Sequence, residues 1–341
     1  MSLAAAFEVK GWCPGALRPM ASGDGLLARI RPWCSAFTLD QAAGLAEIAA
    51  RLGNGHLDLT RRANLQIRGL GEKHVPELHE ALGSLGLLDR DARSEAARNI
   101  MVGPFAGPRA RTLARELSCH LDLDAAPKFG WLVDGPPFTV VDQRADVAFC
   151  LVGGGVAVRR DGQWLGMAPR DEVLAPNPRY TPLDEVPVVG SRPPGVAAPF
   201  GRLQAPQLRD LVALARRAGA TEVRLSPWRA LYFDAPVAGA ETLGLIVDAD
   251  DPLLRIDACP GAPACRSSSV DTRGDARRIA ARGFAGSVHV SGCAKGCARS
   301  AIADLVLVGD HGGYGVVRNG TARDRAGRHI AVADVLTVLD A

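Results

Sequence analysis

The sequence predicts an α+β protein in which one two-part unit occurs twice. Two pairs of segments repeat in the same order along the chain, and a set of paired cysteines lies in the second copy only. The chain has 341 residues, of which 47% are hydrophobic and 23% charged, so it is long enough for two or more domains with buried cores. We therefore expect four parts in the order A1–B1–A2–B2, where each A part is small and each B part is larger.

The first repeat relates residues 49–67 to residues 215–233 without gaps, at a spacing of 166. In both copies the pattern predicts a helix, a turn, and two strands in which apolar residues alternate with polar ones. Thr38 is a suitable N-cap for the first helix, and Gln41 three residues later completes a capping box. Gly53 is typical of the residue just beyond a helix end. Each A part is therefore expected to be a small α+β unit.

The second repeat relates residues 145–162 to residues 303–320 at a spacing of 158. Seven positions are identical, and both copies predict two strands joined by a glycine-rich turn. Either repeat alone could arise by chance among strands rich in alanine, glycine and valine. Two repeats in the same order at similar spacing weaken that explanation, so we interpret the chain as an internal duplication.

The repeats set the expected boundaries of the four parts. We expect A1 over residues 1–75, B1 over 76–190, A2 over 191–246 and B2 over 247–341. Residues 168–206 hold nine of the 23 prolines, which predicts a long extended connection between the two copies.

Charge and hydropathy exclude several classes of partner. The net charge is only +3, which argues against a nucleic-acid partner or an anionic membrane surface. No uncharged apolar stretch approaches about 18 residues, so no membrane span is expected. The first residues show no basic region followed by an apolar run, as a secretory signal would. We expect a cytoplasmic protein, in which paired cysteines favour metal binding over disulfides.

Four cysteines form two closely spaced pairs in the second copy. Cys259 and Cys265 are separated by five residues, and Cys293 and Cys297 by three. The 27 residues between the pairs have room for a helix and a strand, so both pairs are expected on loops that the fold brings together. Four thiolates from two loops can hold the four irons of a 4Fe–4S cluster. When the two copies are aligned at the spacing of 158, Cys293 matches Gly135, so the first copy lacks these ligands.

Zinc is the alternative metal for these thiolates, and unligated thiols are a third possibility. Structural zinc sites usually separate paired ligands by two to four residues, which the second pair satisfies and the first does not. Glycines at 261, 292 and 296 permit tight turns and leave backbone N–H groups free to point at sulfur. We therefore predict an iron–sulfur cluster. Cys150 lies in an apolar strand and is expected in the core.

This cysteine pattern, in the second half of a duplicated chain, resembles the sulfite/nitrite reductase family. The resemblance implies two ferredoxin-like half-domains and two larger α/β lobes, with a 4Fe–4S cluster beside sirohaem. More narrowly, the chain resembles the precorrin-3B synthases, which are members of that family. The segments that carry this narrower resemblance are residues 13–30, 59–69, 127–135, 257–265 and 289–298.

The narrower resemblance implies a monooxygenase of aerobic cobalamin biosynthesis. Such an enzyme hydroxylates precorrin-3A with dioxygen and a reductant and forms a γ-lactone. The resemblance implies a mononuclear non-haem iron in place of sirohaem, with ligands that the sequence does not identify. The histidines show no spacing typical of a 2-His-1-carboxylate site, and His289 is expected in the core or close to the cluster rather than as a ligand.

The resemblance also implies residues that bind the macrocycle. The motif Thr60-Arg61-Arg62 points to Arg62, with Arg61 beside it, and the pair Arg98-Asn99 points to Arg98. Lys128 matches a family lysine, but Gly130 stands where the reductases have a second polar group. Arginine is suited to this task because a precorrin carries a rim of carboxylates, which guanidinium groups bind in pairs of hydrogen bonds. We predict Arg62, Arg98 and Lys128 as catalytic and substrate-binding, and Arg61 as substrate-binding.

Two rival functions remain open from the sequence. One is a sirohaem-dependent sulfite or nitrite reductase, although the loss of a donor at Gly130 argues against reduction of a small anion. The other is a non-catalytic iron–sulfur or zinc protein. The chain shows no glycine-rich dinucleotide fingerprint after a strand, so we expect an external electron donor, either NADH-linked or of the ferredoxin type.

Overall fold

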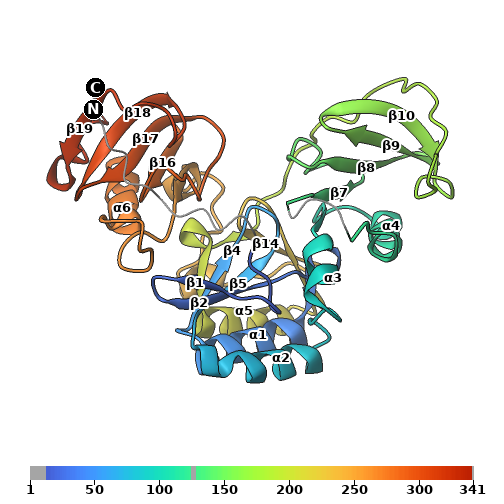
Figure 1. The fold of residues 1–341 in the computed structure, drawn as a ribbon, viewed down its shortest axis with the longest axis horizontal. Coiled ribbons are helices and arrows are strands. Elements are labelled where there is room, and N and C mark those ends of the chain that lie inside the picture. The colour runs from blue at the N-terminus through green and yellow to red at the C-terminus, as the bar shows by residue number, and fades with distance from the viewer. Residues whose placement is uncertain (1–12, 124–127, 340–341) are drawn as a thin grey trace.

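The computed structural model describes residues 13–123 and 128–339. A central part carries two lobes that stand on either side of it (Figure 1). The central part is built from strands and helices of both copies, and each lobe is built from one copy. This arrangement is the α+β, internally duplicated architecture that the sequence predicts. Among the described residues, no helix has the length and apolar character needed to cross a membrane.

Two antiparallel sheets form the central part. The first has the order β1-β2-β5-β4-β12 and the second the order β11-β14-β13-β3. The strands of the first sheet are β1 Met20–Ser22, β2 Gly25–Ile30, β5 Leu65–Leu70, β4 His56–Leu59 and β12 Arg202–Gln204. Those of the second are β11 Val196–Ala197, β14 Ala230–Phe233, β13 Glu222–Leu225 and β3 Ala36–Thr38.

The two copies exchange edge strands in this central part. Strand β12 of the second copy pairs with β4 of the first, and β3 of the first copy pairs with β13 of the second. Neither half can therefore complete its sheet alone, and the central core draws leucines, alanines and valines from both. Separating the two copies would expose strand edges and this shared core.

Helices cover one side of the central sheets. Helix α1 (Leu39–Leu52) packs against α5 (Ala205–Arg217), and α2 (Val75–Ser84) packs against α1 (Figure 1). The predicted capping box is confirmed, since the Thr38 side chain accepts from Gln41 N–H and the Gln41 side chain accepts from Thr38 N–H. A short helix α3 (Ala92–Ala97) leads into the first lobe.

As predicted, Gly53 is the first residue beyond α1, but it is not left-handed, as a glycine at a helix end often is. It ends α1 in an extended conformation, with φ −106° and ψ −160°, and the left-handed residue is Gly55 at φ 80°. Glycine is needed at 53 for a different reason, because a Cβ there would collide with the backbone carbonyl of Arg68. The close approach of helix and strand, rather than the handedness of the cap, selects the residue.

Each lobe holds a five-stranded sheet of the same topology. The orders are β6-β7-β8-β9-β10 and β15-β16-β17-β18-β19, with three parallel strands followed by two antiparallel ones. The first lobe has β6 Ile100–Val102, α4 Pro108–Cys119, β7 Trp131–Asp134, β8 Val147–Val152, β9 Gly155–Arg160 and β10 Gln163–Pro169. The second has β15 Ile256–Ala258, α6 Thr272–Arg282, β16 Val288–Ser291, β17 Ala303–Asp310, β18 Gly313–Gly320 and β19 Arg328–Ala331.

Unusual backbone conformations recur at equivalent positions of the two copies, as a duplication predicts. Ala63 and Arg229, at the first spacing, have φ values of 50° and 62°, and Asp161 and Asn319, at the second, have 50° and 47°. Left-handed residues other than glycine are uncommon, so their recurrence at equivalent positions reflects one inherited backbone.

One part of the predicted register is wrong by a residue. Strand β7 begins at Trp131 and β16 at Val288, so these strands are related by 157 rather than 158. In the alignment of the two copies, Cys293 is therefore equivalent to Pro136 instead of Gly135. The inference drawn from the register stands, because the first copy still has no cysteine at this position.

The proline-rich connection is irregular over most of its length. After β10 the chain makes turns and an isolated bridge between Met167 and Thr181, then runs without regular structure to β11. Several of its apolar side chains are exposed, with Val188 71% accessible. Its last turns are held to the central part by Arg192, whose guanidinium stacks on the Trp228 ring at 4.3 Å.

Candidate metal centre and the arginines around it

The two cysteine loops lie side by side at one edge of the second lobe. Cys259 follows β15 and Cys293 lies just after β16, and these strands are parallel neighbours. The carboxyl ends of parallel strands meet at the same sheet edge, which brings the loops together. The backbone N–H of Gly292 donates to Cys259 Sγ at 3.1 Å, and the backbone N–H of Lys295 points to the Cys293 sulfur.

The four thiols lie in one electrostatic neighbourhood. Cys297 is exposed as a residue, but the protein around its sulfur excludes enough water to raise the pKa of the thiol to about 11; Lys295 opposes that rise, and the other three thiols of the set add to it. Burial likewise raises the pKa of Cys293, with Cys265 and Cys259 adding to the shift. In the described part of the chain, no three histidine, cysteine or acidic side chains already converge as metal ligands. The four thiols are thus close together but are not arranged as a complete set of metal ligands.

The residues present fit an iron–sulfur cluster. All four donors are thiols on two adjoining loops, and backbone N–H groups already point at two of the sulfurs. Gly261 and Gly296 are left-handed at φ 66°, which lets each loop turn tightly beside its cysteines. Cys150 behaves differently, as predicted, because it is fully buried and burial raises its pKa to about 12.

Adjacent arginines on one loop reach towards opposite lobes. Arg61 extends to the second lobe, where its Nε donates to the Ala298 carbonyl at 2.7 Å and its Nη2 pairs with Asp257. Arg62 extends to the first lobe, where its Nη1 donates to the Arg144 carbonyl at 2.7 Å. The loop after β4 therefore lies at the junction of all three parts of the molecule.

A compact ionic cluster holds the residue that follows Cys297. Asp257 pairs with Arg61, Arg229 and Arg299, with N–O distances of 3.2 Å for the last two. Arg229 also donates to the Ala298 carbonyl at 2.9 Å, the same oxygen that Arg61 uses. Both copies of the central unit thus contribute an arginine to the edge of the cysteine loop.

Gly130 has a clear structural role beside Arg62. A Cβ at position 130 would collide with the Arg62 guanidinium, so the guanidinium occupies the space that a side chain there would fill. The backbone N–H of Gly130 donates to Asp146 Oδ2 at 2.6 Å. The absence of a side chain at Gly130 therefore leaves room for the Arg62 guanidinium on the side of the first lobe.

The other two predicted residues are placed differently. Arg98 is buried, donates to both oxygens of Asp89 at 2.8 and 2.7 Å, and lies 3.9 Å over the Trp33 ring. In this arrangement it stabilises the junction of α3 with the central part. Lys128 is exposed. The structure therefore brings Arg61 and Arg62 to the junction but not Arg98 and Lys128, and the roles of all four towards a substrate stay predictions.

Several buried guanidinium groups around the junction have unused donors. Within the described ranges, nitrogen atoms of Arg29, Arg31, Arg229 and Arg273 are buried without a hydrogen-bond partner. Leaving a buried donor unpaired costs about 1–3 kcal/mol, more for charged groups, so each of these nitrogens favours a partner that can accept a hydrogen bond.

Sequence reasoning missed most of these arginines, and it did not show that the His289 ring lacks hydrogen-bond partners among the described residues. Arg229 could have been found, because it lies in the second copy of the loop that carries Arg61 and Arg62, at the position equivalent to Ala63. His289 is buried on β16 with neither ring nitrogen bonded to any described residue. Burial lowers its pKa to about 4, so the imidazole is neutral near pH 7, as the prediction of a core position implied.

Comparison with known proteins agrees with this architecture. Residues 18–85 match the model of the nitrite/sulfite reductase ferredoxin-like half domain. The structure resembles that of the Mycobacterium tuberculosis NirA protein, with a TM-score of 0.67, 19% identity, and coverage of 92% of this chain and 79% of that one. The fold is therefore that of the sulfite and nitrite reductases.

Relatives of known name show to which family within this group the chain belongs. A precorrin-3B synthase from Sinorhizobium sp is 31% identical over 92% of this chain and 83% of its own length. A ferredoxin–nitrite reductase from Leptolyngbya laminosa is 24% identical over 87% of this chain and 79% of its own length. The chain belongs to the precorrin-3B synthase family, within the larger group of sulfite and nitrite reductases.

Proposed function

We propose that the protein is a precorrin-3B synthase that hydroxylates precorrin-3A with dioxygen and an external reductant and forms a γ-lactone. One observation favours a precorrin-3B synthase over a sulfite or nitrite reductase: the Arg62 guanidinium occupies the space that a side chain at Gly130 would fill. A site for sulfite or nitrite needs donors gathered around a small anion. Here a donor is absent at 130, and Arg62 is turned towards the first lobe, where it can meet a carboxylate at the edge of a large ring.

The chain's own residues would bind and orient the substrate. Arg62 and Lys128 would hold ring carboxylates on the side of the first lobe, and Arg61 would do so beside Ala298, with Arg98 as a further candidate. Asp257 fixes the guanidinium of Arg61, so less side-chain freedom is lost on binding. A 4Fe–4S cluster on Cys259, Cys265, Cys293 and Cys297 would supply electrons singly, and a mononuclear iron with ligands not yet identified would supply oxygen chemistry.

The direct test is conversion of the proposed substrate. The purified chain, with its iron and sulfide reconstituted, is incubated without oxygen with precorrin-3A, and labelled dioxygen and a reductant are then added. The product should be heavier by one labelled oxygen atom. An NADH-linked and a ferredoxin-type donor are supplied in separate reactions. Unchanged substrate with both donors would contradict the proposal.

A sirohaem-dependent reductase is the second candidate, favoured by relatives such as the 24% identical sulfite reductase (ferredoxin) 2 of Mycolicibacterium paratuberculosis. It predicts a coloured tetrapyrrole that copurifies with the protein and is extracted by acidic acetone. One zinc without sulfide would instead support a non-catalytic protein. We also propose that the protein acts in the cytoplasm.

Replacing Gly130 by alanine should weaken substrate binding with little effect on folding. The added Cβ must displace the Arg62 guanidinium, which lies at the far end of a flexible side chain, so the fold can adjust. We expect the free energy of unfolding to change by less than about 1 kcal/mol. We expect affinity for an acidic tetrapyrrole to fall about tenfold, the size expected for one charge-assisted contact.

The matched control is Gly154→Ala in the same lobe, where a Cβ would meet nothing within 4 Å. Binding is measured by quenching of tetrapyrrole fluorescence, and folding by thermal denaturation. Equal affinities for the Gly130 and Gly154 variants would show that the position of Arg62 does not matter for binding.

A further inference from the structure

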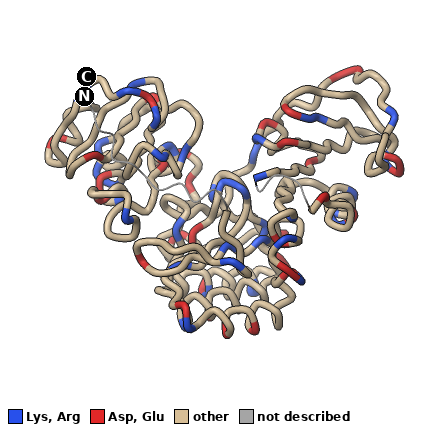
Figure 2. Tube along the Cα trace, in the orientation of Figure 1, with Lys and Arg blue, Asp and Glu red and all other residues tan. Residues whose placement is uncertain are grey.

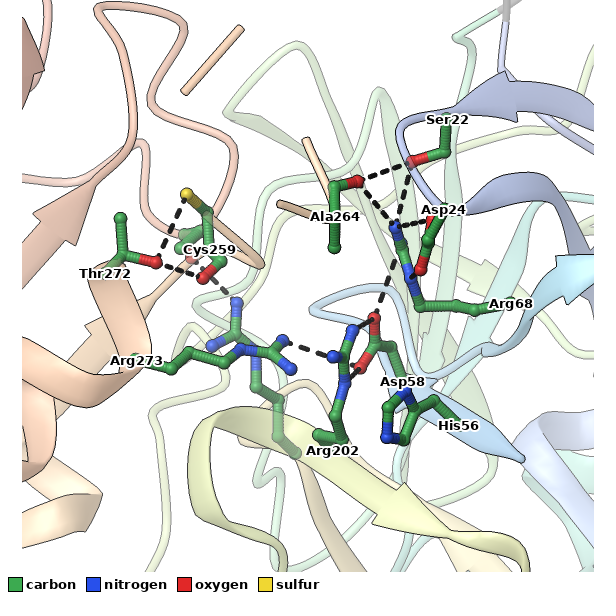
Figure 3. A network of polar contacts seen from close by, with 12 residues as sticks. Ser22, Asp24, His56, Asp58, Arg68, Arg202, Cys259, Ala264, Thr272 and Arg273 are labelled. Carbon is green, nitrogen blue, oxygen red and sulfur yellow. Dashed lines mark hydrogen bonds and ion pairs between the residues drawn. The ribbon is translucent and has the colours of Figure 1, made fainter. Parts of the chain in front are cut away.

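A cavity of about 710 Å³ lies behind the first cysteine loop, on the side facing the central part. Its walls come from His56 and Arg202 on the central sheet, Arg273 and Arg277 on α6, and Pro260 and Ala264 on the loop. Figure 3 shows Arg273 and Cys259 on one side of this space and Asp24 and Arg68 on the other. The volume is in the range of about 300–1,000 Å³ typical of small-molecule sites.

Arg273 lines this cavity with unused hydrogen-bond donors. Its side chain is largely buried, with the residue 8% exposed, and its Nε and Nη1 have no partner among the described residues. Only Nη2 contacts an acid, at 3.5 Å from Asp58 Oδ1. A buried cation with two free donors is costly, so the site favours a group that can accept from it.

Positive charge exceeds negative charge around the cavity. Asp58 is shared, because it accepts two hydrogen bonds from Arg202 at 2.7 and 2.9 Å and also lies 3.5 Å from Arg68. Asp24 is used by Arg68, at 2.8 and 2.7 Å (Figure 3). In the described part of the chain, the acid that Arg273 contacts is therefore also used by Arg202 and Arg68.

Two further features of helix α6 shape the same wall. Arg277, one turn after Arg273, adds a second cation and lies 5.2 Å over the Phe200 ring. Asp271, at the rim, accepts the backbone N–H of Gly274 at 3.0 Å and caps the helix. Its carboxylate is thereby committed to the helix end.

We infer that this cavity binds a small ligand carrying a phosphate or carboxylate group, which lies between Arg273 and Arg277. Guanidinium groups recognise both anions through paired hydrogen bonds. Such a group could come from a nucleotide-like electron donor or from an acidic tetrapyrrole. The inference goes beyond the proposed function and does not depend on the hydroxylation reaction.

Calorimetric titration of the full chain with pyrophosphate and, separately, with benzene hexacarboxylate tests this site. We expect one-site binding of at least one anion, which weakens as sodium chloride is added. Arg277→Gln should weaken binding about tenfold, and Arg273→Gln should do the same or more. Arg277 is exposed, so its replacement keeps the test valid even if Arg273→Gln fails to fold.

Arg278→Gln is the matched control, because it removes the same charge from the same helix. Arg278 pairs with Asp275 at 2.9 Å and does not line the cavity. Tighter binding of pyrophosphate would identify a phosphate-bearing ligand, and tighter binding of the hexacarboxylate a carboxylate one. Absence of binding by both anions, or equal weakening by Arg277→Gln and Arg278→Gln, would overturn the inference. Since no precorrin is used, this outcome is independent of the proposed enzymatic activity.

Discussion

Replacing Cys293 by serine should remove the proposed cluster and, with it, the activity. Cys293 lies among four thiols on two adjoining loops, and the Lys295 backbone N–H already points at its sulfur. Serine has nearly the same shape but is a poor ligand for iron, so the fold of the loop should survive while the metal is lost. We expect iron and acid-labile sulfide to fall to background, and precorrin-3A hydroxylation to fall by more than about 100-fold.

Cys119→Ser is the control for this experiment. Cys119 is exposed at the end of α4 in the lobe that holds no paired cysteines, so the change alters a thiol far from the predicted ligands. Iron and sulfide are measured chemically on protein prepared without oxygen, and the fold is checked by circular dichroism. Full iron and sulfide content in the Cys293 variant would remove the assignment of this residue as a ligand.

Replacing Asp58 by asparagine should destabilise the whole junction between the central part and the second lobe. Asp58 is the shared partner of Arg202 and Arg273, and lies 3.5 Å from Arg68 (Figure 3). Asparagine keeps the shape but leaves three largely buried cations with one fewer acid. We expect the free energy of unfolding to fall by about 3–5 kcal/mol, as when one partner of a buried ion pair is removed.

Asp40→Asn is the matched comparison, because Asp40 pairs with Arg216 at the surface and its side chain is 90% exposed. Loss of such a pair should change stability by less than about 1 kcal/mol. Urea unfolding of both variants, in the same cofactor state, measures the difference. Similar losses in the two variants would show that the buried cluster around Asp58 does not stabilise the junction.

The stability that Asp58 contributes should depend on pH in a defined direction. Burial alone would raise the pKa of Asp58, but Arg273, Arg202 and Arg68 outweigh it and hold the pKa below the ordinary value of 3.8. A carboxylate with a lowered folded-state pKa stabilises the fold fully above its unfolded-state pKa and progressively less as the pH falls below it. The wild type and Asp58→Asn should therefore differ most near neutral pH and converge in acid.

Charged residues are concentrated where the parts of the molecule meet. In Figure 2, basic and acidic residues gather where the central part meets the two lobes, as well as on the outer faces. The pairs that join the parts, such as Arg61 with Asp257 and Arg111 with Glu222, link residues far apart in the chain. The relative placement of the lobes thus depends on ion pairs as well as on shared sheets.

The sequence by itself determined the features that are local or periodic. Residues close together in the sequence determine the capping box at Thr38 and Gln41, the duplicated strand pairs and the spacing of the four cysteines. Such patterns follow from helix and strand geometry, which repeats over a few positions and therefore leaves a readable trace. The duplicated α+β fold could be predicted for that reason.

Only the tertiary structure decided which distant residues meet. The exchange of β3 and β12, the opposite directions of Arg61 and Arg62, and the guanidinium over Gly130 join positions tens to hundreds of residues apart. An arginine on a loop has the same local sequence whether it faces solvent, an aspartate or an empty pocket. Its partner is set by how whole sheets and lobes pack, because burial and charge pairing are properties of the assembled chain rather than of any short segment.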